Sequence, residues 1–238
     1  MVAMMRSSLE LLLYPDVPFG GKFTPSPGVR LEAALSSMGE AEHRTRCERK
    51  LWQACRKLAL AWHGGDEALR AEEDFYLQTV REAPALFGEH ALYVHYHLEA
   101  LVLLARAAMD IAAGAFGPLL TPPFRRDRCD SLNDLVKGFE SDGTGLPIGQ
   151  YFRDLRQAPG SWLNILTSAN GHRGLRDKLA HQMEFPIDYM ELDPPSEKER
   201  AVVWVTRDLP VPLVSFVDGL RGGVVQGFMK LEEECLPQ

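Results

Sequence analysis

Residues 172–182, HRGLRDKLAHQ, bring a guanidinium, a carboxylate and an imidazole together in Arg176, Asp177 and His181. On a helix, Asp177 and His181 are one turn apart and lie on the same face. Asp177 can then accept a hydrogen bond from one ring nitrogen of His181, which fixes the tautomer and favours the imidazolium. Arg176 lies about 140° around the helix axis from His181, and its long side chain can still fold toward the same groove.

These groups have the chemistry that cleavage of an RNA phosphodiester through the ribose 2′-hydroxyl requires. His181 can transfer the proton as general acid or base, and the planar guanidinium of Arg176 can stabilise charge on the phosphate. Ala180 is small, so another surface can approach between them. The stretch is therefore a candidate site for phosphodiester cleavage.

The segment LRDKLAH resembles the signature of the HEPN superfamily (higher eukaryotes and prokaryotes nucleotide-binding). In that signature an Arg is followed by a polar residue and, after a few further positions, by a His; Arg176, Asp177 and His181 fill these positions. The setting is also similar, because the chain is mostly helical and a helix led by Trp162 precedes the motif. The resemblance covers residues 160–183 best and the helices from residue 90 onward more loosely.

The resemblance implies a metal-independent endoribonuclease of a toxin–antitoxin or other defence system, which acts on RNA as a homodimer and uses no cofactor. Its catalytic residues would be Arg176, Asp177 and His181. The expected substrate-binding or site-lining residues are Glu99, Arg173 and Lys178. An antitoxin or other defence protein is the expected partner. The alternative is a non-catalytic HEPN-like binding or dimerisation module, in which Arg176 pairs with an acid.

Other polar groups have simpler explanations. An Arg followed by a His recurs at Arg56 and His63, but Lys57 follows this Arg and the interior LALAW is apolar, which is typical of a core helix. Glu40 and His43 form a Glu-x-x-His pair of the kind that contributes to di-metal helical bundles, but the chain has no second copy. We therefore expect no metal site.

A polar stripe crosses the most apolar predicted helix, about residues 90–115. His95, Glu99, Arg106 and Asp110 fall within about 60° of one another around its axis. The expected explanation is a solvent-facing edge on which Arg106 and Asp110 form an i,i+4 pair. The alternative is a polar lining of a cleft or of a subunit interface.

The elements that must position these residues are predicted to be mostly helices, which gives a mostly α fold: a HEPN-like helical bundle with a minor strand or hairpin near residues 200–207. The helices are expected at residues 29–63 (stopped by Gly64-Gly65), 66–82, 90–115, 130–140, 150–156, from Trp162 with Ser161 as its N-cap, and 211–234. Residues 1–27 are predicted to be an irregular arm. Residues 28–238 are predicted to form a single domain, with the HEPN-like core at about 90–232.

Composition agrees with a folded chain, since 45% of the residues are hydrophobic and 25% are charged. The net charge of −7 is unfavourable for nucleic-acid binding, but residues 121–181 carry +2 and the remainder −9. Any contact with a polyanion is thus expected in that middle segment. The four cysteines match neither a zinc site nor a disulfide framework, so free thiols are expected. Because no signal peptide or membrane span is evident, we expect a cytoplasmic protein without a membrane partner.

Overall fold

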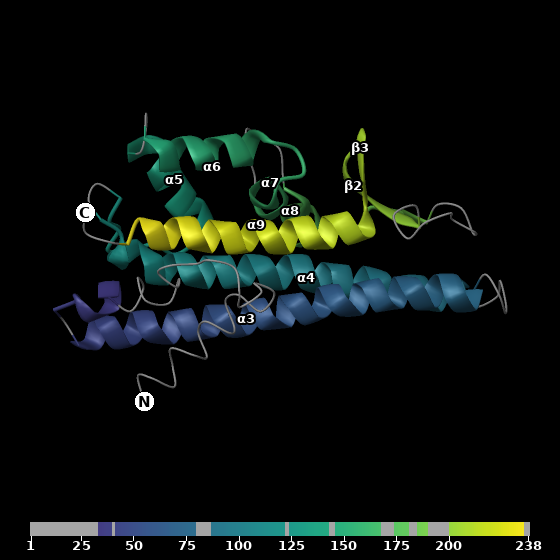
Figure 1. Cartoon of the computed structure of the whole chain (residues 1–238), viewed down its shortest axis with the longest axis horizontal. Coiled ribbons are helices and arrows are strands. Elements are labelled where there is room, and N and C mark those ends of the chain that lie inside the picture. The colour runs from purple at the N-terminus through teal and green to yellow at the C-terminus, as the bar shows by residue number, and fades with distance from the viewer. Residues whose placement is uncertain are drawn as a thin grey trace, which may run out of the picture. The chain divides into compact units, whose positions relative to one another are not determined.

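The computed structural model describes residues 33–39, 41–79, 87–121, 124–142, 146–167, 174–180, 185–189 and 200–235 (Figure 1). Its elements are α3 (Ala41–Asp74), a π-helical turn (Phe75–Thr79), α4 (Phe87–Phe116), a 3-10 turn (Gly117–Leu119), α5 (Leu132–Asp142), α6 (Pro147–Gln157), α7 (Trp162–Leu166), α8 (Leu175–Ala180), β1 (Ile187–Tyr189), β2 (Ala201–Thr206), β3 (Leu209–Pro212) and α9 (Leu213–Glu233). The prediction of a mostly α fold with a minor strand or hairpin is confirmed. The predicted N-terminal arm lies outside the described residues.

The chain divides into two compact units, each made of segments that are distant in the sequence. The first unit takes its described residues from Met1–Ala59, Ala105–Asp154 and Val224–Gln238. The second unit takes its described residues from Leu60–Leu104 and Leu155–Gly223. The predicted single domain over residues 28–238 stays a prediction.

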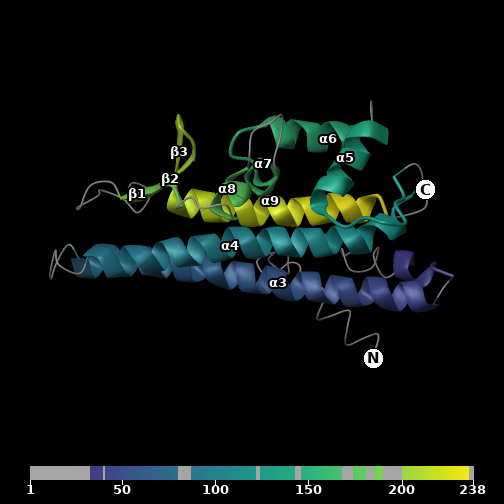
Figure 2. The same cartoon turned by 180° about the vertical axis from the view of Figure 1, so that it is seen from behind.

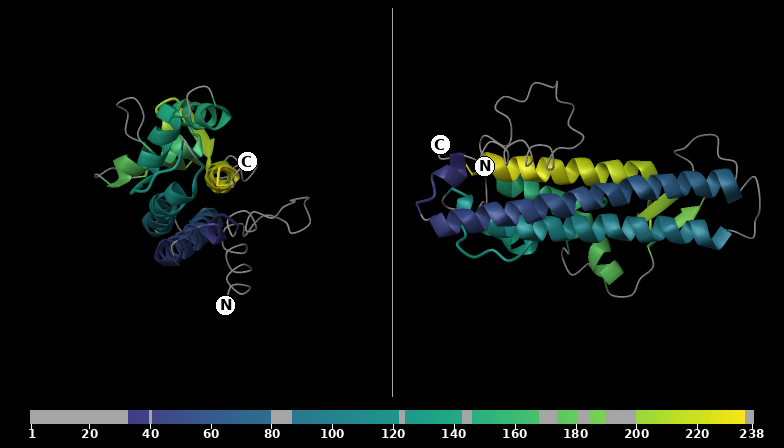
Figure 3. Two further views of the ribbon diagram at one scale, coloured as in Figure 1. Left: turned by 90° about the vertical axis from the view of Figure 1, so that its left-hand side faces the viewer. Right: turned by 90° about the horizontal axis from the view of Figure 1, so that it is seen from below.

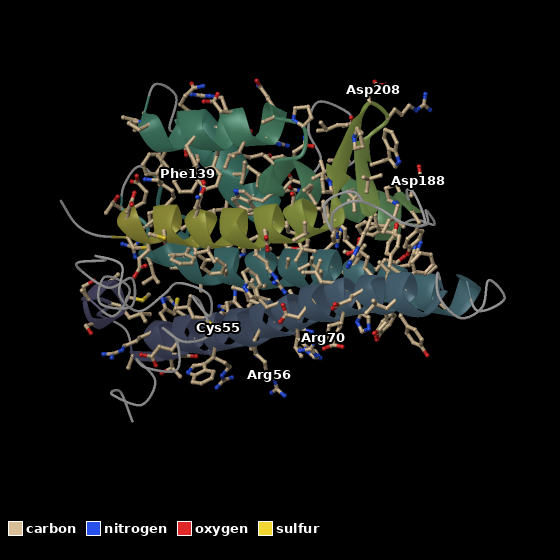
Figure 4. All side chains as sticks on the ribbon, turned by 45° about the vertical axis from the view of Figure 1, so that its right-hand side comes forward. Cys55, Arg56, Arg70, Phe139, Asp188 and Asp208 are labelled. Carbon is tan, nitrogen blue, oxygen red and sulfur yellow. The ribbon has the colours of Figure 1, made fainter. Side chains whose placement is uncertain are left out.

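The core of the first unit is apolar and rich in aromatic rings. Phe139 on α5 stacks on Phe152 of α6 with ring centroids 5.2 Å apart, and it also contacts Phe124 at 5.0 Å. Figure 4 labels Phe139 among the side chains around α5 and α6. Phe116 on α4 meets Phe228 on α9 edge to face, with centroids 5.9 Å apart. These contacts join the two short helices to each other, and the two long helices to each other, inside this unit.

Arg106 and Asp110 form the predicted ion pair on α4, with Nε and Oδ2 2.9 Å apart. The expected solvent-facing edge is wrong for Arg106, which is only 5% exposed. The reason is that Asp110 also accepts a hydrogen bond from the backbone N–H of Leu132, the first residue of α5, at 2.8 Å. The pair therefore joins α4 to the start of α5 inside the first unit.

In the second unit, α3 continues through Gly64 and Gly65, which were expected to stop it. A Cβ on Gly64 would lie 3.2 Å from the carbonyl oxygen of His97 and 3.3 Å from the backbone nitrogen of Leu101, both on α4. Gly64 thus lets two helix backbones approach closely. The predicted helices at 29–63 and 66–82 are wrong as separate elements, because both fall largely within α3. Figure 3 shows α3 and α4 side by side.

The second unit also holds a three-stranded antiparallel sheet in the order β1-β2-β3 (Figure 2). The predicted strand at 200–207 is confirmed as β2, and the short strands β1 and β3 flank it. The end of α3 holds the start of β2, because Glu72 accepts a hydrogen bond from the backbone N–H of Ala201 at 3.0 Å. The hydroxyl of Tyr76 donates to the carbonyl oxygen of Arg200.

The apolar residues at helical spacing along α4 are fully buried and form its core stripe: Leu98, Leu101, Val102, Ala105, Met109 and Ala112. Within the described part of the chain, the segment Ala91–Leu119 is the one helix long and apolar enough to cross a membrane by length and composition. Its most apolar 18-residue window is 61% buried within the protein, and core helices pass the same test. The expected cytoplasmic location stays a prediction.

Candidate functional site

The HEPN-like motif begins on α8, which spans Leu175–Ala180. Arg176 is the second residue of this helix; its side chain is half-buried and interacts within the chain. Arg173 and His181 lie outside the described residues, as do the side chains of Asp177 and Lys178. The predicted pairing of Asp177 with His181 therefore stays a prediction.

Helix α7 prepares the position of α8. The predicted N-cap is confirmed, because the side chain of Ser161 accepts a hydrogen bond from the backbone N–H of Asn164 at 3.1 Å. Trp162, the first residue of α7, is 4% exposed and packs on Gly223 of α9, where a Cβ would lie 2.7 Å from the indole Cγ. The Trp-led helix is thus fixed on α9 by a position that only glycine fits.

Gly174 brings the start of α8 against the end of α7. A Cβ at this position would lie 2.9 Å from the carbonyl oxygen of Asn164 and 2.8 Å from the carbonyl carbon of Thr167. The chain that follows Trp162 thus forms two helices, α7 and α8, with Arg176 on the second. Because the contact is between backbones, it holds the helix that carries Arg176 in one place.

Glu99, the expected site-lining residue from a neighbouring helix, lies half-buried on α4. Like α8, it belongs to the second unit. Its role beside Arg176 stays a prediction.

A second cluster of polar side chains lies beside the sheet and was not predicted as a site. It lines an open pocket of about 600 Å³ in the second unit. The pocket, here called the sheet pocket, is lined among the described residues by His95, Phe185, Pro186, Ile187, Asp188, Trp204 and Arg207. His95 comes from the polar stripe on α4, for which a cleft lining was the alternative explanation.

The register of the sheet brings Asp188 and Trp204 together. Asp188 on β1 is paired with Val202 on β2, so Trp204, two residues further on, lies on the same face. The indole Nε1–H of Trp204 donates a hydrogen bond to Oδ2 of Asp188, with the two atoms 2.7 Å apart. This bond fixes the orientation of a half-buried indole at the pocket wall.

Neighbouring residues anchor β1 on both of its sides. Phe185, which is 2% exposed, forms a buried part of the pocket wall and meets Phe216 of α9 edge to face, with centroids 5.8 Å apart. The ring of Tyr189 packs obliquely on the ring of Phe75, with centroids 4.4 Å apart. Its hydroxyl donates a hydrogen bond to the carbonyl oxygen of Ala91, which lies one helical turn before His95. Burial raises the pKa of Tyr189 well above its usual value of about 10, so the hydroxyl keeps its proton.

Arg207 reaches the pocket from the turn between β2 and β3. Thr206 pairs with Leu209, so Arg207 and Asp208 form a two-residue turn, and the register is irregular between Trp204 and Thr206. Such irregularities re-aim side chains at the end of a strand. Figure 4 shows Asp208 at the tip of this hairpin and Asp188 nearer the helices.

No metal centre is evident in the part of the chain that the structure describes, which holds no group of three His, Cys, Asp or Glu side chains suited to a metal ion. Glu40 lies outside the described residues, so the Glu40–His43 alternative is not decided by the structure. The four cysteines are free, as predicted, and the structure shows all four to be buried: Cys47, Cys55, Cys129 and Cys235.

Comparison of this chain with protein-family models, with curated proteins and with solved structures finds no match. The resemblance to the HEPN superfamily therefore depends on the LRDKLAH motif and its helical setting alone.

Proposed function

We propose that this protein is a HEPN-type endoribonuclease that cleaves RNA as a homodimer without a metal ion. The observation that supports the proposal most directly is the placement of Arg176. It follows a close backbone contact between Gly174 and the end of α7, so its side chain projects from a fixed helix; the residue is partly exposed, although its Nε is buried. A phosphate-binding cation needs both a fixed origin and access to substrate.

In the proposed reaction, His181 takes the proton of a ribose 2′-hydroxyl, and the resulting oxygen attacks the adjacent phosphorus. The bond from phosphorus to the 5′-oxygen breaks, and that oxygen receives a proton from a histidine acting as general acid. Arg176 stabilises the additional charge on the phosphate, and Asp177 orients His181. The products are a 2′,3′-cyclic phosphate and a 5′-hydroxyl, which a dimer can form with one motif on each side of the strand.

The test is incubation of the purified protein with single-stranded and structured RNAs in EDTA, followed by analysis of the product ends. We expect cleavage that leaves 5′-hydroxyl ends and that falls at least 100-fold in Arg176→Ala and in His181→Ala, on the scale of a lost acid–base group. Arg70→Ala is the matched control, because this arginine is exposed and pairs with Glu67 one turn away. Equal cleavage by all variants, or none by the wild type on any RNA, would overturn the proposal.

A non-catalytic binding or dimerisation module is the second candidate function. The observation that favours it is that Arg176 already interacts within its own chain, which is how the arginine of a purely structural motif would be used. In that case Arg176→Ala should weaken self-association in sedimentation experiments, and the wild type should cleave no RNA. A dimer that is unchanged by the substitution would contradict this alternative.

A further inference from the structure

We propose that the sheet pocket binds one unpaired nucleotide of a single-stranded RNA, with the base stacked on Trp204 and the phosphate held by Arg207. The proposal rests on the proposed function in naming RNA as the ligand. It assigns the recognition of the strand to a place separate from the Arg176 motif. The base it favours is guanine.

The size and openness of the pocket suit a single nucleotide within a strand. Its volume of about 600 Å³ falls within the range of roughly 300–1,000 Å³ that is usual for small-ligand sites. Because the pocket is open to solvent, the chain on either side of the bound nucleotide can leave it. The walls combine apolar surface from Phe185, Pro186 and Ile187 with charged groups at Asp188 and Arg207.

Trp204 offers the base a flat surface that is already in place. Its indole N–H is bonded to Asp188 at 2.7 Å, so the ring cannot turn without breaking that bond. The side chain is half-buried, which leaves part of the ring accessible. Stacking of a base on an exposed aromatic ring is a main source of affinity for unpaired nucleic acids.

Asp188 gives the pocket a preference among bases. An ionised carboxylate only accepts hydrogen bonds, and here Oδ2 already accepts one from Trp204. A base that lies on the indole therefore fits best if the edge facing Asp188 carries donors. Guanine presents two neighbouring donors, N1–H and the N2 amino group, whereas uracil presents a single N3–H.

Arg207 supplies the charge that attracts the phosphate. Its side chain is exposed at the turn of the hairpin, and a guanidinium can bind phosphate through two parallel hydrogen bonds. His95, on α4, contributes an imidazole N–H that can donate to the ribose or to a phosphate oxygen. The pocket thus brings a base surface, a base-reading acceptor and a phosphate-binding cation to the walls of one cavity.

The test is fluorescence anisotropy with two labelled eight-nucleotide RNAs, one of uridines only and one with a single central guanosine. The His181→Ala background keeps the RNA intact during titration in EDTA at low salt. We expect the guanosine-containing RNA to bind at least several-fold more tightly. Arg207→Ala and Trp204→Leu should each weaken its binding about 10-fold or more, and Asp188→Asn should abolish the preference for guanosine.

Arg70→Ala is the matched control, since it removes an exposed cation from the same unit and Figure 4 shows Arg70 well apart from Asp188. We expect it to bind within two-fold of the parent. Equal losses in Arg70→Ala and Arg207→Ala, which non-specific charge attraction would give, overturn the proposal. Unchanged RNA binding in Arg207→Ala also overturns the proposal. So does tighter binding of a peptide that carries aromatic and acidic residues than of either RNA.

Two further readouts keep the outcomes distinct. Trp204→Phe retains a ring at the position, so it should lose less affinity than Trp204→Leu even if the latter is less stable by circular dichroism. If the wild type binds RNA through the pocket but never cleaves it, the ribonuclease proposal fails and this one stands. If pocket variants bind and cleave like the wild type, this proposal fails alone.

Discussion

Replacing Asp110 with alanine should destabilise the protein through two losses at once. Arg106, which is 5% exposed, would lose the carboxylate that lies 2.9 Å from its Nε. The backbone N–H of Leu132 would lose its acceptor at the start of α5. Both groups are held away from bulk water, so the lost bonds are not simply replaced by hydration.

The magnitude follows from the burial of the two partners. Removing one member of a fully buried ion pair costs about 3–5 kcal/mol. Because the Asp110 side chain is 27% exposed, we expect the cost of losing this pair to lie at or below the lower limit of that range. Loss of the acceptor at the start of a helix costs about 1 kcal/mol. We therefore expect the free energy of unfolding to fall by about 3 kcal/mol, out of a typical total of about 5–15 kcal/mol.

The assay is urea unfolding followed by far-UV circular dichroism, with Asp127→Ala as the matched control. Asp127 also faces an arginine, since its Oδ1 lies 3.7 Å from Nε of Arg125. The Asp127 side chain is 90% exposed, so its removal should change the free energy of unfolding by less than about 0.5 kcal/mol. Adding Arg106→Met to Asp110→Ala should recover part of the loss, because no charge is then left without its carboxylate. A loss below about 1 kcal/mol in Asp110→Ala would refute the reasoning.

Two further predictions concern glycines and thiols. Gly222→Ala should raise stability by about 0.5–1 kcal/mol, because nothing lies near its Cβ position, whereas Gly223→Ala should lower it by about 1–3 kcal/mol, because its Cβ would lie 2.7 Å from Cγ of Trp162. Urea midpoints that shift in the same direction in Gly222→Ala and Gly223→Ala would contradict this prediction. Burial raises the pKa of Cys55 to about 12 and that of Cys129 to about 11, so the thiols should resist a disulfide reagent at pH 8 until the protein unfolds. The stability that the two buried, protonated thiols contribute is complete below about pH 9 and is lost as the pH rises toward these pKa values. A Cys55→Ala/Cys129→Ala variant should therefore show a smaller fall in urea midpoint than the wild type between pH 8 and 10.5. Rapid labelling of the thiols in the native protein would contradict their burial.

Sequence patterns predicted the features that depend on near neighbours. The apolar spacing along α4, the Ser161 cap and the strand at β2 each follow from residues a few positions apart. Gly64 and Gly65 were misjudged because glycine is as suited to close helix packing as to ending a helix. For Gly64 the choice between the two depends on α4, whose contact residues lie more than thirty positions further along the chain.

The same limit applies to the polar residues. Arg106 was expected at a solvent-facing edge, since nothing nearby in the sequence indicates that Asp110 also binds the backbone of Leu132. The sheet pocket was missed because it needs the register of β1, a strand of three residues that is too short to recognise. A carboxylate two residues after Pro186 and a tryptophan within an apolar strand are the local signals of their pairing.

The bond between Glu72 and the backbone N–H of Ala201 has a consequence for how the protein opens. Glu72 is 5% exposed, so releasing β2 from the end of α3 would leave a buried carboxylate without that donor. Fraying of the strand alone is therefore disfavoured. The sheet and the last turns of α3 should open together as one cooperative segment, so the wall of the sheet pocket has the local stability of the long helix.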